Sequence, residues 1–283
     1  MTEKTAAIVF EISTTTPGID VSKIPDSKLH ARLIDEAGLF AYGTKLDRSD
    51  LLDRCYELAK QYQLFNKSSD AKAFDTIVVG GILPLDAAMG LGAHQSMPHY
   101  RYAGKQFVMA GVRGPAVDFY PIGAMTGEIQ EDKKLMKRES IHPVDSAAPA
   151  KNVIVNVTTN SSMKEDEAKS ARIAIGDDNA TIWQISPRAA GNLILTPTNA
   201  SQIVQEIANL LSEIHTHHGS VKYSFSCACP VFLAYILGNL ICSRDKWGNV
   251  NILTYTNGVY SIEWKDDGSS TKKRTHEDDG SNF

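Results

Sequence analysis

The sequence feature that most constrains the fold is a motif that occurs twice. Residues 84–92 and residues 230–238 both read Pro-x3-Ala-x3-Gly. A strand-like run rich in β-branched or aromatic residues precedes each motif, at 74–80 and at 221–226. Two motifs with matching flanks indicate that the chain is built from two similar halves.

The elements further upstream agree with a duplication. A helical pattern with one apolar stripe lies before each of these strands, at 51–62 and at 203–214. Each half also opens with a strand that ends in hydroxyl residues, at 7–12 and at 153–157. The two halves therefore present the same elements in the same order.

Turn and stop signals complete each half. Asn257-Gly258 between apolar runs predicts a β-hairpin, and Gly104 has the same role in the first half. We expect Gly92 and Gly238 to end their helices, because glycine is favoured just past a helix C-terminus.

Strands that alternate with helices predict an α/β protein: two tandem Rossmann-like halves with mostly parallel sheets, related by a pseudo-two-fold axis. The predicted first half covers 1–112, and a connecting segment with a polar helical piece around 128–139 covers 113–150. The predicted second half covers 151–264, and a polar, disordered tail follows at 265–283.

Composition excludes several classes of function. The formal net charge of −4 argues against binding to duplex DNA or to an anionic membrane through bulk charge. The longest apolar run, residues 227–242, is shorter than the roughly 20 residues that span a bilayer. Four cysteines are too few for a disulfide scaffold, and the N-terminus lacks a secretory signal, so we expect a cytoplasmic protein.

Ligands of open parallel sheets bind beyond the carboxyl ends of the strands, close to helix N-termini. Backbone N–H groups at a helix start, together with hydroxyl donors, bind anions without lysines. Two such sites related by symmetry would surround one pocket, which suits a ring-shaped ligand that repeats its phosphates. The candidate ligand-binding residues at these strand ends are Ser13, Thr14, Thr15, Gly80, Gly81, Ile82, Thr158, Thr159, Asn160, Ser161, Ala228 and Cys229.

Three further candidates lie outside these strand ends. Arg188 follows turn-forming residues and is placed either to pair with a phosphate or to be a solvated loop arginine. Tyr255 could stack on a base, although aromatic residues in strands also form the core. Asn257 belongs to the adjacent hairpin turn. The hydroxyl runs themselves also suit turns and helix caps.

The sequence predicts no catalytic residue, metal or cofactor. His215, His217 and His218 fall at the end of a predicted helix, where histidines interact favourably with the helix dipole. The pair Cys227 and Cys229 has no second cysteine pair, as a zinc site would need. The sequence contains no nucleophile elbow and no phosphate-binding P-loop.

The second motif and its flanks resemble the SAVED family. The resemblance is carried by Ser226-Cys-Ala-Cys-Pro230-x3-Ala234-x3-Gly238, followed by Ile252-Leu-Thr-Tyr255 and Tyr260. SAVED domains are ligand sensors of bacterial anti-phage defence, in CBASS and some type III CRISPR systems, and they resemble two fused CARF-like halves. The resemblance extends over residues 6–264.

This resemblance implies a sensor that binds a cyclic oligonucleotide, of the cyclic tri- or tetra-adenylate class, between its two halves and signals by oligomerisation. Members of the family are usually fused to an effector, whereas the two halves take up this chain, so we expect a separate effector protein. Two alternatives stay open. One is a ring nuclease or a sequestering protein acting on the same ligand, and the other is a protein-interaction subunit without a small ligand.

Overall fold

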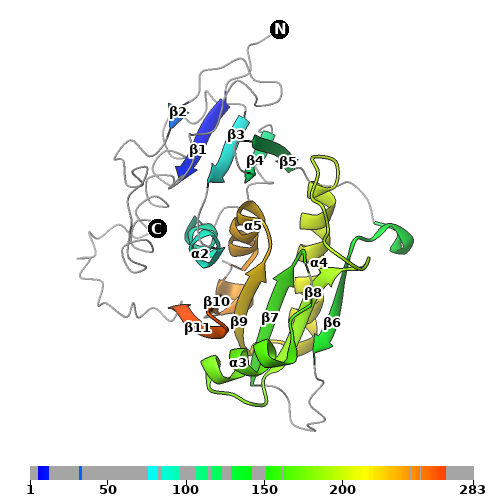
Figure 1. Cartoon of the computed structure of the whole chain (residues 1–283), viewed down its shortest axis with the longest axis vertical. Helices are drawn as coiled ribbons and strands as arrows, with labels where there is room; N and C mark the ends of the chain where they lie inside the picture. The colour runs from blue at the N-terminus through cyan, green and yellow to red at the C-terminus, as the bar shows by residue number, and fades with distance from the viewer. Residues whose placement is uncertain are drawn as a thin grey trace, which may run out of the picture.

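A computed structural model gives the arrangement of the chain, in which two β-sheets are separated by helices (Figure 1). The residues that the structure describes are 6–12, 32–33, 76–81, 85–95, 106–113, 116–122, 129–141, 151–160, 162–241, 244–248 and 250–265.

The first sheet has five strands in the order β2-β1-β3-β4-β5. They are β1 (Ala6–Ile12), β2 (Arg32–Leu33), β3 (Thr76–Gly81), β4 (Gln106–Arg113) and β5 (Ala116–Ile122). The first four run parallel to their neighbours, and β5 is antiparallel to β4. The strands predicted at 7–12 and 74–80 are thus confirmed as β1 and β3.

The second sheet has six strands in the order β11-β10-β9-β7-β8-β6. They are β6 (Met136–Ile141), β7 (Asn152–Thr158), β8 (Thr181–Pro187), β9 (Lys222–Ala228), β10 (Val250–Thr256) and β11 (Val259–Lys265). The four central strands are parallel, and the outer strands β11 and β6 are antiparallel to their neighbours.

The two sheets have the same strand order. The order β2-β1-β3-β4-β5 of the first sheet corresponds to β8-β7-β9-β10-β11 of the second, and β6 is an additional outer strand. Each sheet ends in an antiparallel hairpin at the equivalent side. The α/β class with mostly parallel sheets in two similar halves is therefore confirmed.

The hairpin of the second sheet is formed as predicted. Asn257 and Gly258 join β10 to β11, and their φ angles of 52° and 86° are both positive, as a type I′ turn requires. In the first sheet the antiparallel ladder of β4 and β5 starts at the Arg113–Ala116 pair, later in the sequence than expected, and Gly104 lies outside the described residues.

Four of the helices position the sheets. They are α2 (Leu85–Gln95), α3 (Glu165–Ile175), α4 (Ala200–His218) and α5 (Val231–Ile241). In Figure 1, α2 and α5 lie side by side between the two sheets. Helix α4 confirms the helix predicted at 203–214, whereas the one predicted at 51–62 lies outside the described residues.

The expectation that Gly92 and Gly238 end their helices is wrong. Both lie inside a helix, at the point where α2 and α5 pack closest together. A Cβ atom on Gly92 would lie 2.0 Å from the carbonyl oxygen of Tyr235, and one on Gly238 would lie 2.0 Å from that of Met89. Each glycine is therefore required by the other half of the chain, because a side chain would separate the two backbones.

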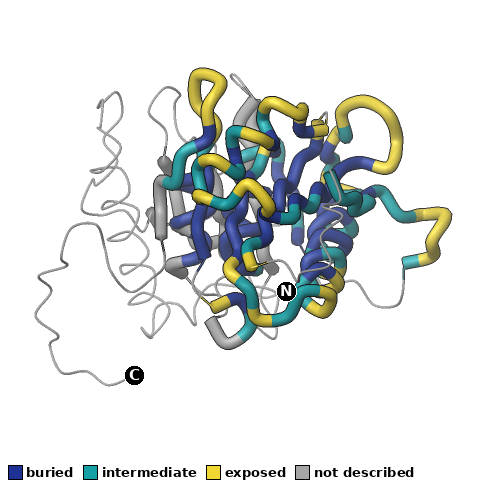
Figure 2. Tube along the Cα trace, turned by 90° about the horizontal axis from the view of Figure 1, so that it is seen from below, coloured by how far each residue is buried: buried dark blue, intermediate teal, exposed yellow. Residues whose placement is uncertain are grey.

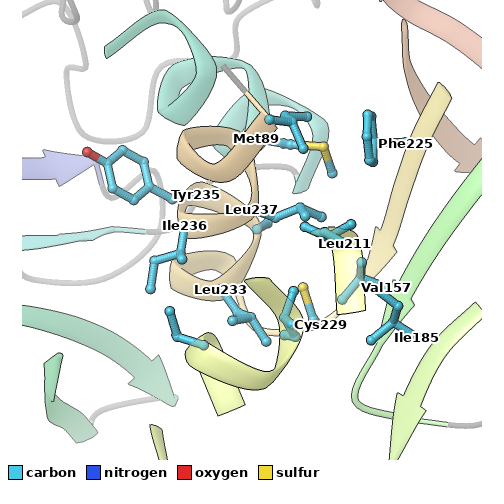
Figure 3. Packing of buried hydrophobic residues seen from close by; sticks show 14 of the residues in the cluster. Met89, Val157, Ile185, Leu211, Phe225, Cys229, Leu233, Tyr235, Ile236 and Leu237 are labelled. Atoms are coloured by element: carbon cyan, nitrogen blue, oxygen red, sulfur yellow. The ribbon is translucent and has the colours of Figure 1, made fainter. Parts of the chain in front are cut away.

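The core lies between these helices and the sheets. Figure 2 shows buried positions along the strands and helices and exposed positions in the loops between them. In Figure 3, Leu233 and Leu237 of α5 point toward the second sheet, whereas Tyr235 points the opposite way. Phe232 of α5 stacks on Tyr120 of β5, with ring centroids 4.6 Å apart. Helix α5 thus packs against both halves.

The segment predicted to contain a polar helical piece around 128–139 forms a strand instead. One short 3-10 turn, η4 (Glu131–Lys133), precedes β6. The carboxylate of Glu206 on α4 accepts hydrogen bonds from the backbone N–H groups of Leu135 and Met136, at 2.8 and 2.7 Å. This carboxylate is buried and fixes the start of β6, a constraint that local sequence does not reveal.

Candidate functional site

The carboxyl ends of β7 and β9 lie next to each other. Thr158 pairs with Ala228 in the parallel ladder, and the Thr158 hydroxyl donates to the Ala228 carbonyl oxygen at 3.2 Å. The backbone N–H of Thr159 donates to the same oxygen at 3.1 Å. Thr158 also accepts a hydrogen bond from the N–H of Asn160 at 2.9 Å. The Thr158 hydroxyl is therefore used inside the turn.

Exposure separates the predicted residues of this edge into two groups. Thr158 and Thr159 are buried, whereas Asn160 and Ala228 are exposed. The structure thus places the backbone of this turn and the Asn160 side chain at the surface, not the threonine hydroxyls. The neighbouring candidate Ser161 lies outside the described residues.

The β10–β11 hairpin brings two more candidates to the same edge, because β10 is parallel to β9. Tyr255, at the end of β10, is 47% exposed, and its ring centroid lies 4.9 Å from that of Tyr260. Asn257 is exposed at the tip of the hairpin. An accessible aromatic ring beside a polar turn can stack on a base.

Behind this surface lies a polar chain that the sequence did not indicate. Tyr260 is hydrogen-bonded to Ser226, and the Ser226 hydroxyl donates to Asn156 Oδ1 at 2.8 Å. Burial raises the pKa of Tyr260 to about 12, so its hydroxyl stays protonated and able to donate. The alternation of polar residues along β7 and β9 is the sequence signal that corresponds to these hydrogen-bonded side chains.

Cys229 faces the protein interior. Figure 3 shows its side chain near Val157 and Leu211, and it is 8% exposed. A hydrogen bond with Cys229 and, to a smaller extent, burial raise the pKa of the Cys227 thiol well above its ordinary value. Asp86 raises the same pKa. Ala87 and Ala88 of α2 belong to the same buried cluster as Cys229, so the start of α2 lies near the carboxyl end of β9.

This proximity brings the carboxyl ends of the two sheets together. Gly80 and Gly81 end β3, Gly81 pairs with Ile12 at the end of β1, and α2 begins shortly afterwards at Leu85. In Figure 1 the arrowheads of β3 and β9 both point toward α2 and α5. The remaining first-half candidates, Ser13, Thr14, Thr15 and Ile82, lie outside the described residues.

Arg188 is engaged elsewhere. Its Nε donates to the carbonyl oxygen of Met136 at 3.0 Å, and its Nη2 pairs with the carboxylate of Glu131. Hydrogen bonds from Lys134 and Arg188 lower the pKa of Glu131, so this carboxylate remains charged. Arg188 therefore links β8 to the start of β6, with its charge balanced by Glu131.

The histidines at the end of α4 are held by packing. The Trp183 indole N–H donates to His218 Nε2 at 2.7 Å, and the guanidinium of Arg138 lies 4.9 Å from the Trp183 ring centroid. His215 Nε2 lies 2.5 Å from the carbonyl oxygen of Lys246. These contacts hold α4 against its neighbours. They also hold the Trp183 ring against His218 and Arg138, away from the carboxyl edge of the sheet.

Residues 126–246 match the sequence pattern of the SAVED family, the "SMODS-associated and fused to various effectors sensor domain". The match covers somewhat less than half of the chain. The matched residues include the segment from β6 to α5, and thus the carboxyl ends of β7 and β9 with Asn160 and Ala228. The SAVED match stops before β10, so Tyr255 and Asn257 lie outside it.

Solved structures with the same fold extend the likeness to nearly the whole chain. The chain is similar to the Cap4 SAVED/CARF-domain containing receptor of Acinetobacter baumannii, solved with the cyclic trinucleotide 3′3′3′-cAAA (TM-score 0.53, 11% identity, 90% of this chain covered). It is also similar to that receptor solved with 2′3′3′-cAAA (TM-score 0.52, 11% identity, 94% covered). Only 51% of the receptor chain is covered in each case, so this chain spans about half its length.

A comparison with curated protein sequences gives no match to this chain. Within its described residues, none of the helices combines the length and the apolar character that crossing a bilayer needs.

Proposed function

We propose that this chain is a receptor for a cyclic oligonucleotide, of the cyclic tri- or tetra-adenylate class, in anti-phage defence. The ligand lies where the carboxyl ends of both sheets approach α2 and α5. The observation that carries the proposal is the match of residues 126–246 to the SAVED sensor domain. The buried cluster that joins the start of α2 to Cys229, just after β9, supports it. Both halves therefore contribute to one site, as a ligand with repeated nucleotides requires.

The chemistry of this edge supports a nucleotide ligand. The Tyr255 ring provides a stacking surface for a base, worth roughly 1–3 kcal/mol. Asn160 and the backbone around Ala228 provide neutral polar groups near the start of α5, where the helix dipole favours an anion. The similar Cap4 receptor was solved with cyclic trinucleotides, which makes these the first ligands to test.

Signal transfer is part of the proposal. Within the described residues, β11 and β6 are the outer strands of the second sheet, and each leaves one backbone edge that its own sheet does not pair. Ligand-dependent contact between such edges of successive copies would build an oligomer, which then activates a separate effector protein. The oligomer is detectable as a ligand-dependent rise in molar mass by light scattering.

The test is a ligand panel. Thermal melting of the full chain is followed with cyclic di-, tri- and tetranucleotides, with linear adenylate as the control. We expect one cyclic tri- or tetra-adenylate to raise the Tm in a concentration-dependent way, because a ligand that binds only the folded state stabilises it. Unchanged melting with every cyclic nucleotide at saturating concentration would overturn the proposal.

A pair of variants then places the site. Tyr255→Ala removes the exposed ring and should weaken binding by about tenfold or more. Lys222→Ala, an exposed residue at the opposite end of β9, should leave the affinity unchanged. Equal affinities for both variants would remove Tyr255 from the site.

A further inference from the structure

The two faces of the second sheet differ in polarity near the carboxyl edge. On the face that α3 covers, the amino-terminal half carries Ile154 and Ile182 in one buried cluster, and Ser224 and Asn251 form a buried polar pair beside them. Toward the carboxyl edge the same face becomes polar although it stays buried. Its polar residues are Asn156, Thr158, Gln184, Ser186 and Ser226, all less than 5% exposed.

These residues form a row across three strands. Asn156 pairs in register with Gln184 of β8 on one side and with Ser226 of β9 on the other. Asn156 accepts from Ser226, and Gln184 Oε1 accepts from the backbone N–H of Met163 at 2.8 Å. Ser186 lies two residues beyond Gln184 on the same face of β8 and nearer to the carboxyl edge.

Among the residues that the structure describes, two atoms of these side chains have no hydrogen-bond partner. They are Gln184 Nε2 and the hydroxyl of Ser186, on side chains that are 0% and 2% exposed. A buried polar group left unpaired is costly, and the great majority of such groups in folded proteins are paired. Both unpaired groups lie on β8, beside the edge where the ligand is proposed to bind.

We propose that Gln184 and Ser186 are the subsite that recognises a base of the bound nucleotide. This inference rests on the proposed function and names the part of the ligand that side chains of β8 bind. Gln184 Oε1 is already occupied, so the pair offers an amide N–H and a hydroxyl to the acceptor atoms of a purine edge.

The ligand group at this subsite is a neutral base and not a phosphate. The nearest cation along β8, Arg188, is paired with Glu131, and burying an unpaired phosphate charge here would be very unfavourable. Two segments flank the subsite, residues 162–164 and residues 188–194. The backbone N–H of Leu193 donates to the Thr159 carbonyl oxygen at 2.8 Å and joins the segment that follows β8 to the turn that follows β7. The base enters when these segments separate.

The experiment is Ser186→Ala in the full chain, measured by calorimetry with cyclic triadenylate and by thermal melting without ligand. Removal of an unpaired buried hydroxyl should leave the Tm unchanged or raise it, since alanine has no polar group to desolvate. Loss of the ligand hydrogen bond should weaken binding about five- to tenfold. A purely structural serine would not combine these two results.

The matched control is Ser224→Ala on the same face of the neighbouring strand β9. The Ser224 hydroxyl accepts from Asn251 Nδ2 at 3.1 Å, so its loss should lower the Tm without changing the affinity. An unchanged affinity in Ser186→Ala, or a fall in Tm as large as that of the control, would overturn the inference while wild-type binding upholds the proposed function. Absence of binding by the wild-type chain would overturn both.

Discussion

The second sheet packs apolar side chains against α4 and α5 on one face, whereas the α3 face is polar toward the carboxyl edge. The first face carries Val153, Val155 and Val157 of β7, all fully buried in the main core cluster. The second face carries Ile154 and then Asn156 and Thr158. The apolar face is organised for close packing, and the polar end of the other face retains hydrogen-bonding groups that packing alone does not need.

The strictest packing is expected where α2 crosses α5. Gly92→Ala and Gly238→Ala each place a Cβ atom 2.0 Å from a carbonyl oxygen of the other helix. Each should lower the free energy of unfolding by more than about 3 kcal/mol, because backbone atoms must move apart. Chemical denaturation measures the loss.

Gly90→Ala is the control within the same helix. A Cβ atom at Gly90 has no neighbour within 4 Å, so alanine should raise stability by about 0.5–1 kcal/mol through its better helix propensity. Near-wild-type stability of Gly92→Ala would show that the helices do not pack as closely as described.

The next largest effect is expected at Glu206, the buried carboxylate on the α4 side. Glu206→Gln keeps one oxygen for the N–H groups of Leu135 and Met136 but places an NH2 group against the Gln202 amide, which donates to the other carboxylate oxygen at 2.7 Å. The loss should be about 2 kcal/mol by urea denaturation. Glu213→Gln, at an exposed pair with Arg138, should change stability by less than about 0.5 kcal/mol. Equal effects would contradict the anchoring role of Glu206.

On the polar face, Ser226→Ala sharpens the contrast with Ser186→Ala. The Ser226 hydroxyl is bonded to Asn156 and to Tyr260, so its removal leaves paired groups without partners. Stability should fall by about 1 kcal/mol, opposite in direction to the change expected for Ser186→Ala. If both variants shift the Tm in the same direction, the paired Ser226 hydroxyl and the unpaired Ser186 hydroxyl do not differ in their contribution to stability.

The smallest effect concerns pH. Burial, and then the charges of His217 and Arg138, lower the pKa of His218. The folded chain therefore binds fewer protons at this site than the unfolded chain, and its stability falls as the pH drops below about 6.5. His218→Gln, whose amide oxygen can still accept from Trp183, should reduce the loss of Tm between about pH 7 and pH 5. His217→Gln removes a smaller cause of this shift and leaves the burial of His218, so it should reduce the slope by less than His218→Gln does. An unchanged slope in His218→Gln would assign the pH dependence elsewhere.

Local chemistry predicted some elements from the sequence, while contacts between distant segments decided others. The Asn257-Gly258 turn depends on the φ preferences of two residues, so it was predictable. The role of Gly92 was not, because it depends on Tyr235 in the other half. The alternating charges around 131–139 suit a helix face as well as a strand, and only pairing with β8 and the Glu206 carboxylate decide for the strand.

The candidate site shows the same division. The sequence placed Thr158, Asn160 and Ala228 at one edge, and the ladder between β7 and β9 confirms that Thr158 and Ala228 meet there. It did not indicate that the Thr158 hydroxyl is used within the turn. The alternation of Ile182, Gln184 and Ser186 was the available signal for the polar row, but its register with β7 was not accessible from sequence.

The central claim is that both halves form one site for one cyclic oligonucleotide. Calorimetric titration of the full chain with cyclic triadenylate, or with the tetra-adenylate if only that ring raises the Tm, tests it most directly through the stoichiometry. We predict one ligand per chain, bound in a single transition. Two equal and independent sites per chain, or no binding heat with either ring where the melting temperature is also unchanged, would contradict the account.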